Sequence, residues 1–432
     1  MRILQFLAIV VVLGTSLPLG LAQDPSPFGT LYTFTGGNDG ANPYAGLTLR
    51  NEAIYGTTLN GGTGNAGTVF SLTPPASPGG AWTETVLHAF TGGSDGSGPY
   101  GDVVFGKYGI GLYGTTEFGG AGDLGTVFSL APPASPGGAW TETSLYSFSN
   151  VPYSPNGAFP TAGVVIGKNG GVYGTTPGNW NIYYGCTVPG CGTVFLLNPP
   201  VSPGGAWTED VLYFFGSGGS VPNGVVIDTS GVLYGTTSGF SGTVFSLTLP
   251  ASPGSRSTVT VLYSFTGGPF GGGSDDGGNP SAGVVIDESG VLYGTTEYGG
   301  TGTACSGGCG TVFSLTPPAT PGGAWTETVL HSFAGGSDGA YPEVGVVIGK
   351  NGGLFGTTAS GGTSNDGTVF SLARPARPGG AWTETVLHDF TGGSDGSNPN
   401  GVAISENGGL FGTTRAGGTG TCGCGTVFAL KP

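Results

Sequence analysis

A repeat of about sixty residues dominates the chain and limits the folds open to it more than any other feature. The tetrapeptide YGTT, or its variant FGTT, begins at Tyr55, Tyr113, Tyr173, Tyr234, Tyr293, Phe355 and Phe411. A second motif, GTVF, follows each one and begins at Gly67, Gly125, Gly192, Gly242, Gly310, Gly367 and Gly425. Successive YGTT motifs start 56 to 62 residues apart. Self-similarity at such a period is typical of solenoids, propellers and other arrays.

Each unit contains four short runs with the composition of β-strands. In the fifth unit they are GVVIDESG (283–290), VLYGTT (291–296), GTVFSLT (310–316) and WTETVLHSF (325–333). Val, Ile, Thr, Tyr and Phe fill these runs, and Gly, Pro, Ser and Asp separate them. No stretch has a 3.6-residue apolar period long enough for a helix. Seven units of four antiparallel strands predict an all-β, seven-bladed β-propeller.

The ends of the repeat distinguish a closed ring from an open solenoid. An isolated run, GTLYTF (29–34), precedes the first unit and matches the end of a fourth run. The last unit ends at GTVFALKP and lacks its own fourth run. We therefore expect the N-terminal strand to complete the last blade, within a single domain over residues 24–432. A solenoid would instead need polar caps at its two ends, and the sequence shows none.

The first residues are typical of a secretory signal peptide. Arg2 precedes an apolar run, and small residues over 20–22 fit a cleavage site, so we expect residues 1–23 to be removed. The rest of the chain has no run of the roughly 20 apolar residues that a membrane span needs. With a net charge of −15 the protein has no basic surface for nucleic acid. We expect a monomer that is secreted or periplasmic.

The repeat resembles the GloVer repeat, named for Gloeobacter and Verrucomicrobia, of the choice-of-anchor tandem repeat proteins. YGTT, the glycine-rich loop, GTVFSL and AWTETVLHSF carry the resemblance, which covers residues 29 to 430. The resemblance implies an exported bacterial protein and assigns no activity. Members of that family often end in an anchoring segment; because this chain stops two residues after its last strand, we expect free secretion or periplasmic residence over surface anchoring.

Glu84 and His88 could be taken for an acid–base pair, but both recur in the repeat. The position of His88 is occupied by Tyr32, Tyr146, Tyr213, Tyr263, His331 and His388 in the other units. Tyrosine cannot replace histidine as a base near neutral pH, because its pKa lies near 10. We therefore interpret both residues as part of the scaffold.

Aspartates gather in the links between units, which we expect on the same face as the loops between runs two and three. They are Asp39, Asp95, Asp275, Asp276, Asp338 and Asp395. Asp before Gly is typical of tight turns. The pair Asp275 and Asp276 could also bind Ca²⁺ weakly, although no DxDxDG spacing supports such a site. No other cofactor and no metal are expected.

Six cysteines form three local pairs, each just before a GTVF motif: Cys186 and Cys191, Cys305 and Cys309, Cys422 and Cys424. In an exported protein this pattern predicts three disulfides. The alternative is zinc held by two pairs from different blades, with no histidine beside them.

One loop departs from the repeat. PGNWNIYYGCTVPGC (177–191) is long and contains Trp180, Tyr183 and Tyr184, which no repeat position explains. Aromatic side chains on such a loop suit the stacking of sugar rings or contact with a protein partner. A local cluster that only covers the loop itself is the alternative.

The sequence favours a binding or structural module over an enzyme. GxSxG, P-loop and HExxH motifs are absent, and all three histidines lie at one repeat position. We expect a polysaccharide or an extracellular protein to bind through one loop face. The alternative is a carbohydrate-active enzyme, a glycosidase or lyase, that uses loop carboxylates. A single asymmetric pocket with clustered carboxylates would favour this alternative.

Overall fold

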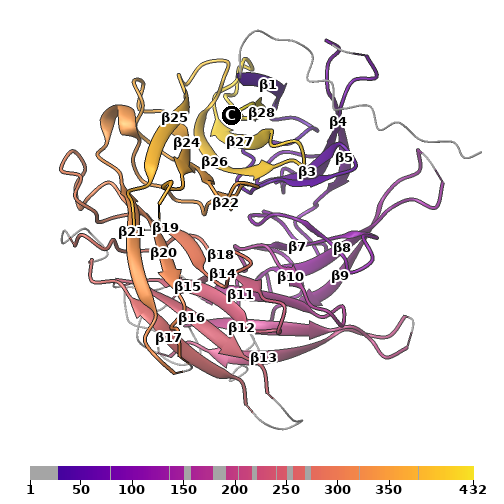
Figure 1. The fold of residues 1–432 in the computed structure, drawn as a ribbon. Helices are drawn as coiled ribbons and strands as arrows, with labels where there is room; N and C mark the ends of the chain where they lie inside the picture. Colours follow the sequence, from indigo (N-terminus) through magenta and orange to yellow (C-terminus); the bar gives the residue numbers. More distant parts are fainter. Residues whose placement is uncertain are drawn as a thin grey trace, which may run out of the picture.

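The computed structural model shows seven four-stranded antiparallel sheets arranged in a ring (Figure 1). It describes residues 28–432 except 78, 136, 150–156, 179–190, 203, 217–220, 240, 251–255, 268–273, 321 and 378. The predicted signal peptide therefore lies outside the described residues. Within the described part of the chain, one short 3-10 turn, η2 (Gly336–Asp338), is the only helical element. No helix there is long and apolar enough to cross a membrane.

The blades follow one another along the chain. Blade 1 contains β2 (Thr48–Arg50), β3 (Ala53–Thr58), β4 (Thr68–Thr73) and β5 (Thr83–Ala89). Blade 2 contains β6 (Val104–Phe105), β7 (Leu112–Thr116), β8 (Thr126–Ala131) and β9 (Thr141–Ser147). Blade 3 contains β10 (Val165–Ile166), β11 (Val172–Gly178), β12 (Cys191–Asn198) and β13 (Thr208–Phe214). Blade 4 contains β14 (Val221–Ile227), β15 (Leu233–Ser238), β16 (Thr243–Thr248) and β17 (Thr258–Ser264).

The remaining three blades have the same order. Blade 5 contains β18 (Val285–Ile286), β19 (Leu292–Thr296), β20 (Thr311–Thr316) and β21 (Thr326–Ser332). Blade 6 contains β22 (Val347–Ile348), β23 (Leu354–Thr358), β24 (Thr368–Ala373) and β25 (Thr383–Asp389). Blade 7 contains β26 (Ser397–Ile404), β27 (Leu410–Ala416), β28 (Thr426–Leu430) and β1 (Phe28–Thr33). In most blades the first strand is the shortest, and these first strands lie toward the centre of the ring (Figure 1).

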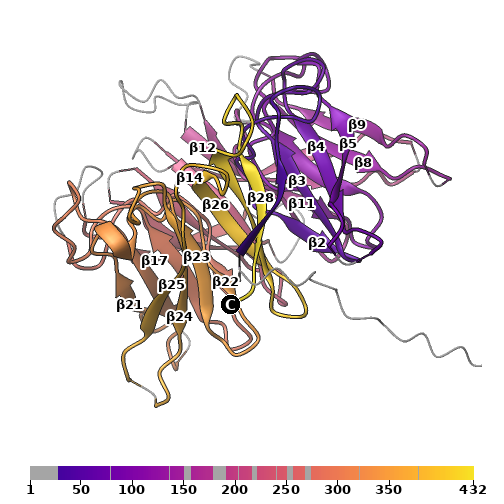
Figure 2. The ribbon, with the colours of Figure 1, turned by 90° about the horizontal axis from the view of Figure 1, so that it is seen from above.

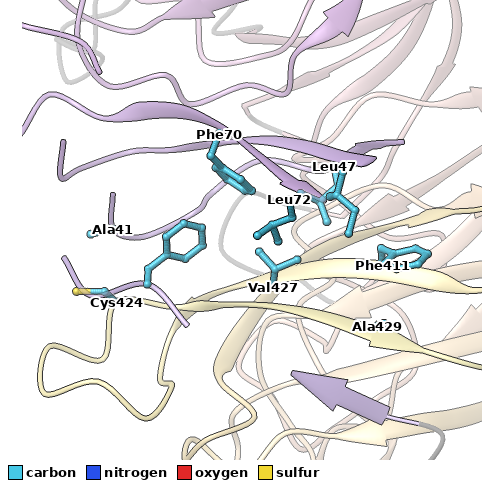
Figure 3. Packing of buried hydrophobic residues seen from close by; sticks show 10 residues of the cluster. Ala41, Leu47, Phe70, Leu72, Phe411, Cys424, Val427 and Ala429 are labelled. Carbon is cyan, nitrogen blue, oxygen red and sulfur yellow. The ribbon is translucent and has the colours of Figure 1, made fainter. Parts of the chain in front are cut away.

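The ring closes where the two ends of the sequence meet, as the isolated GTLYTF run predicted. β1 pairs antiparallel with β28, with Phe28 opposite Leu430 and Thr33 opposite Thr426. After a quarter turn, β28 is seen beside the indigo start of the described chain (Figure 2). At the junction between blades 7 and 1, Phe70 and Leu72 of β4 face Val427 of β28 (Figure 3). Closure pairs strand edges that would otherwise stay open.

Each blade packs against the next through an aromatic pair. A phenylalanine that follows the fourth strand meets, edge to face, the phenylalanine of the next blade's GTVF motif; Phe34 and Phe70 have ring centroids 5.1 Å apart. The same contact repeats at Phe90–Phe128, Phe148–Phe195, Phe215–Phe245, Phe265–Phe313, Phe333–Phe370 and Phe390–Phe428. The YGTT glycine makes room for this ring, since a Cβ on Gly56 would lie 2.7 Å from Phe70. The core is therefore divided among the junctions between blades, which we call seams.

The two threonines of YGTT have different structural roles. The first joins neighbouring blades: Thr57 Oγ1 donates to the carbonyl of Gly101 at 3.1 Å. Its counterparts donate in the same way at Thr115, Thr175, Thr236, Thr295, Thr357 and Thr413. The second stays within its blade, as Thr58 Oγ1 lies 2.8 Å from Thr68 Oγ1. YGTT is therefore a scaffold motif that links all seven blades.

We expect loss of one inter-blade threonine bond to be measurable. Thr295→Val keeps the shape of the side chain and leaves the carbonyl of Val344 without its donor, which lies at 3.0 Å. The free energy of unfolding should fall by about 1–2 kcal/mol. Thr316→Val, at the exposed end of β20, is the matched control and should change little. Chemical denaturation of both variants checks this, and equal stability would contradict the role of Thr295.

A polar contact also repeats along the outer strands. In five blades the tyrosine or histidine of the fourth strand meets the aspartate of the link that follows: Tyr263 OH donates to Asp276 Oδ2 at 2.8 Å, and His388 Nε2 lies 3.2 Å from Asp395 Oδ2. A backbone amide of the link also donates to this aspartate: the Thr266 amide lies 3.0 Å from Asp276 Oδ2. Histidine and tyrosine thus do the same structural work at this position.

In several seams a glutamate from the next blade lies near this aspartate. The carboxylate Oε1 atoms of Glu84, Glu142, Glu209, Glu327 and Glu384 are buried and have no hydrogen-bond partner among the described residues. Glu84 lies near Asp39, whereas His88 lies 3.4 Å from Asp95 Oδ2. The two residues therefore belong to two different seams, although both are on β5.

Candidate functional site

The links between blades and the loops from the second to the third strand meet on one face, as the sequence predicted. Isolated bridges join the two sets of segments, for example Gly278 with Tyr298 and Ala340 with Ser360. The repeat scaffold thus holds the links and the loops next to each other at the same end of the strands. Side chains that differ from unit to unit on this face are therefore brought together by an almost symmetric frame.

A cavity of about 440 Å³ opens on this face at blades 5 and 6. Glu297, Tyr298, Ser306, Tyr341 and Glu343 line it. Glu297 and Tyr298 follow β19, Ser306 lies in the loop before β20, and the other two come from the link between β21 and β22. The cavity therefore combines carboxylates, phenols and a hydroxyl on segments fixed by strands.

The backbone at Tyr341 is left-handed, as it is at the residue before the link proline in five other units: Asn42, Gly98, Phe159, Asn279 and Asn398. The φ of Tyr341 is 57°, in the left-handed region that bulky residues rarely adopt. Two hydrogen bonds hold it there: the Tyr341 amide donates to Cys309 O at 2.9 Å, and the Ala359 amide donates to Tyr341 O at 3.0 Å. The ring of Tyr341 meets that of Tyr298 edge to face, with centroids 5.7 Å apart.

The two glutamates of the cavity have different surroundings. Burial raises the pKa of Glu297, the nearby charge of Glu343 raises it further, and hydrogen bonds from Tyr298 and Asn279 oppose the rise. Asn279 Nδ2 donates to Glu297 Oε2 at 2.8 Å. Glu343 instead has a cationic partner, with Oε2 2.9 Å from Arg415 Nη2. One carboxyl thus tends to keep its proton while the other faces a positive charge.

Arg415 extends the site toward the junction of blades 7 and 1. Its guanidinium lies 3.9 Å from the ring centroid of Tyr44, and the Tyr44 ring lies 4.1 Å from that of Tyr100. The Nε atom of Arg415 is buried and has no hydrogen-bond partner within the described part of the chain. We call Glu297, Tyr298, Tyr341, Glu343, Arg415, Tyr44 and Tyr100 the polar arc. Only 8% of the residues are charged, so this gathering stands out from the rest of the chain.

The sequence analysis missed the polar arc, although a signal for it was present. Five of its seven members lie at two repeat positions, directly after YGTT and directly after the link proline; Tyr298 and Tyr341 are next to these positions. The first position is occupied by Leu59, Glu117, Pro177, Ser238, Glu297, Ala359 and Arg415. The second is occupied by Tyr44, Tyr100, Thr161, Asn223, Ser281, Glu343 and Asn400. Such variation beside fixed motifs, compared position by position, would have indicated the site.

The structure places the predicted aspartates outside the cavity. Asp276 accepts hydrogen bonds from Tyr263 and Thr266, and neighbouring donors lower its pKa against the opposing effect of burial. Asp275 beside it is exposed. The weak calcium site at these two residues stays a prediction, which a calorimetric titration with Ca²⁺ checks.

Two of the three predicted disulfides are present, Cys305–Cys309 and Cys422–Cys424. The first closes the loop that carries Ser306 into the cavity. Cys191 begins β12 opposite Gly178, but Cys186 lies outside the described residues, as do Trp180, Tyr183 and Tyr184. In the sequence these residues stand between β11 and β12.

Comparison with known proteins places the chain in a family. The profile of the Gloeobacter/Verrucomicrobia repeat matches residues 21–238 and 302–432, most of the chain. The protein belongs to the Gloeobacter/Verrucomicrobia repeat family. The resemblance seen in YGTT and GTVFSL is thereby confirmed. The curated proteins contain no match to this member of the family.

Solved structures similar to this Gloeobacter/Verrucomicrobia repeat protein share its fold at low identity. A candidate 6-phosphogluconolactonase from Bacteroides uniformis has a TM-score of 0.50 and 15% identity, covering 83% of this chain and 88% of that chain. Hydrazine synthase from Kuenenia stuttgartiensis has a TM-score of 0.51 and 11% identity, covering 87% and 94%. PorZ, a surface component of the type IX secretion system of Porphyromonas gingivalis, has a TM-score of 0.50 and 14% identity. The match covers 90% of this chain and 46% of PorZ. The repeat protein thus spans about half of PorZ, and these similarities concern the fold alone.

Proposed function

We propose that this protein is an exported binding module that holds a carbohydrate on the face of the polar arc. The observation that carries the proposal is the asymmetric cavity lined by Glu297, Tyr298, Ser306, Tyr341 and Glu343, set in an otherwise repetitive ring. Sugar rings stack on aromatic faces, and their hydroxyls bond to carboxylates and guanidinium groups. The unpartnered Nε of Arg415 provides a donor for such a hydroxyl.

Export is part of this proposal. The N-terminal sequence has the pattern of a signal peptide, and disulfides such as Cys305–Cys309 persist in oxidising compartments. A polysaccharide or glycoprotein outside the cytoplasm is therefore the ligand class that we expect. The aromatic loop with Trp180, Tyr183 and Tyr184 would extend the contact surface beyond the cavity.

Retention on immobilised polysaccharides tests the binding function. Tyr298→Ala and Arg415→Met should each weaken retention at least tenfold, because they remove an aromatic face and a donor. Tyr108→Ala is the matched control, since Tyr108 is 79% exposed in the turn between β6 and β7, at the opposite ends of the strands. Trp180→Ala with Tyr183→Ala separately tests the loop. Retention that survives both arc variants would overturn the proposal for the cavity.

The pair Glu297 and Glu343 supports glycoside hydrolysis as a second candidate function. A carboxyl that keeps its proton can act as general acid, and a second, charged carboxylate can act as base or nucleophile. Reducing-sugar release from a panel of polysaccharides tests it. Glu297→Gln should abolish release and preserve retention. If the unmodified protein releases no sugar, hydrolysis is excluded while the binding function still stands.

A further inference from the structure

The seam between blades 5 and 6 contains a histidine, an aspartate and a glutamate, as does the seam between blades 1 and 2 with His88, Asp95 and Glu142. His331 on β21, Asp338 in the following link and Glu384 on β25 each present a ligand atom, and these atoms lie within 4.8 Å of one another. His331 Nε2 is 3.2 Å from Asp338 Oδ1 and 3.3 Å from Oδ2. All three residues are half-buried, and the side chains of His331 and Asp338 are 20% and 23% exposed. His331 and Glu384 are on fourth strands, and Asp338 is in the link that also contributes Tyr341 and Glu343 to the polar arc.

A break in the repeat leaves the aspartate of this seam with a freer oxygen. In four other links a threonine hydroxyl donates to Oδ1 of the aspartate, as Thr91 does to Asp95 at 2.6 Å. Ala334 replaces this threonine here, so only its amide donates, to Asp338 Oδ2 at 2.6 Å. Asp338 Oδ1 therefore faces His331 with no hydroxyl donor bound to it.

The glutamate has an oxygen without a hydrogen-bond partner, as do its four counterparts Glu84, Glu142, Glu209 and Glu327 in other seams. Glu384 Oε1 is buried without a hydrogen-bond partner within the described ranges. Together with Asp338 Oδ1 and the imidazole, it forms a set of one nitrogen and two carboxylate oxygens on three separate segments. A buried carboxylate oxygen without a donor is unfavourable, and a cation would satisfy it.

We infer that His331, Asp338 and Glu384 form a binding site for a zinc-class divalent cation. Tetrahedral zinc with bonds of about 2.0–2.2 Å places its ligand atoms about 3.3 Å apart, and His331 Nε2 and Asp338 Oδ1 already have this separation. Glu384 has to move inward, since the three ligand atoms lie within 4.8 Å of one another and not yet all at this separation. Three protein ligands leave a fourth position for water. The imidazole selects a zinc-class ion, since Ca²⁺ takes six to eight oxygen ligands.

The other seams supply internal controls for this site. The seam between blades 6 and 7 has His388 and Asp395, but Phe28 stands where the glutamate would be and stacks on His388 with centroids 3.6 Å apart. The seam between blades 4 and 5 has Tyr263 in place of the histidine. Tyrosine is therefore a residue that this position already accepts in the same fold.

Titration of the metal-free protein, without a histidine tag, tests the site. Co²⁺ should bind one equivalent per chain with the visible absorption of a tetrahedral ion, and Zn²⁺ should displace it. His331→Tyr and Glu384→Gln should abolish this signal, and Ala334→Thr should weaken binding at least tenfold by restoring the hydroxyl donor. His388→Tyr should leave binding unchanged, and circular dichroism should show that all variants are folded. Absence of Co²⁺ and Zn²⁺ binding, or binding that survives His331→Tyr, would overturn the inference.

Discussion

Removal of residues 28–34 should destabilise the whole ring, not only its last blade. This segment contributes β1, which supplies the outer strand of blade 7, and two aromatic anchors. Phe34 is fully buried against Phe70, and Phe28 packs on His388 and Phe428. Loss of one buried phenylalanine side chain typically costs about 3–5 kcal/mol. We expect the melting temperature to fall by on the order of 10 °C or more, or the protein not to fold.

The test compares two truncated proteins by thermal unfolding. A chain that starts at residue 28 keeps β1 and should melt like the chain that starts at residue 24. A chain that starts at residue 35 lacks it. A synthetic peptide of residues 27–37 should restore part of the lost stability by adding a strand to the exposed edge of β28. Equal melting of the two truncated proteins would show that closure by β1 is unimportant.

Glutamates in the seams should make the protein less stable as the pH rises from 5 to 8. Burial and, to a smaller extent, a nearby aspartate raise the pKa of Glu84, Glu142 and Glu327 from 4.5 to about 7. The folded state therefore binds protons more tightly than the unfolded state. Their contribution to stability is fully present below about pH 4.5, falls as the pH rises, and is lost above about pH 7.

Glutamine at these three positions should reverse the effect, because the neutral amide resembles the protonated carboxyl. The side chains are about half-buried, so we expect on the order of 1 kcal/mol per site at pH 8 after discounting for solvent screening. At pH 5 the triple variant should differ little from the unmodified protein. Urea unfolding at both pH values measures this. Glu406→Gln, in an exposed turn, is the control, and an unchanged pH dependence in the triple variant would refute the account.

The fold was predictable from the sequence because closure and blade number are both properties of a repeat. Seven YGTT motifs, the spare run at 29–34 and the missing last run indicated the ring and its strand pairing. The glycine of YGTT belongs to the same pattern, since its lack of a side chain makes room for the ring of Phe70 at Gly56. These features depend on local patterns that recur at fixed spacing.

The polar arc was not predictable in the same way, because its members are far apart in sequence. Arg415 and Glu343 are 72 residues apart and meet through two different repeat positions. Nor did composition indicate that Tyr263 and His331 bind equivalent aspartates, Asp276 and Asp338, in successive links. That pairing depends on how a link folds back onto its own outer strand, which residue spacing alone does not specify.

The hydrogen bond from each first YGTT threonine to the following blade uses a backbone carbonyl as acceptor. A backbone acceptor is present whatever side chain the neighbouring unit carries. Units can therefore be duplicated, exchanged or reordered without loss of this hydrogen bond between neighbouring blades. Evolution can thus vary the ligand-facing residues one unit at a time, and engineered circular permutants cut within a link should still assemble.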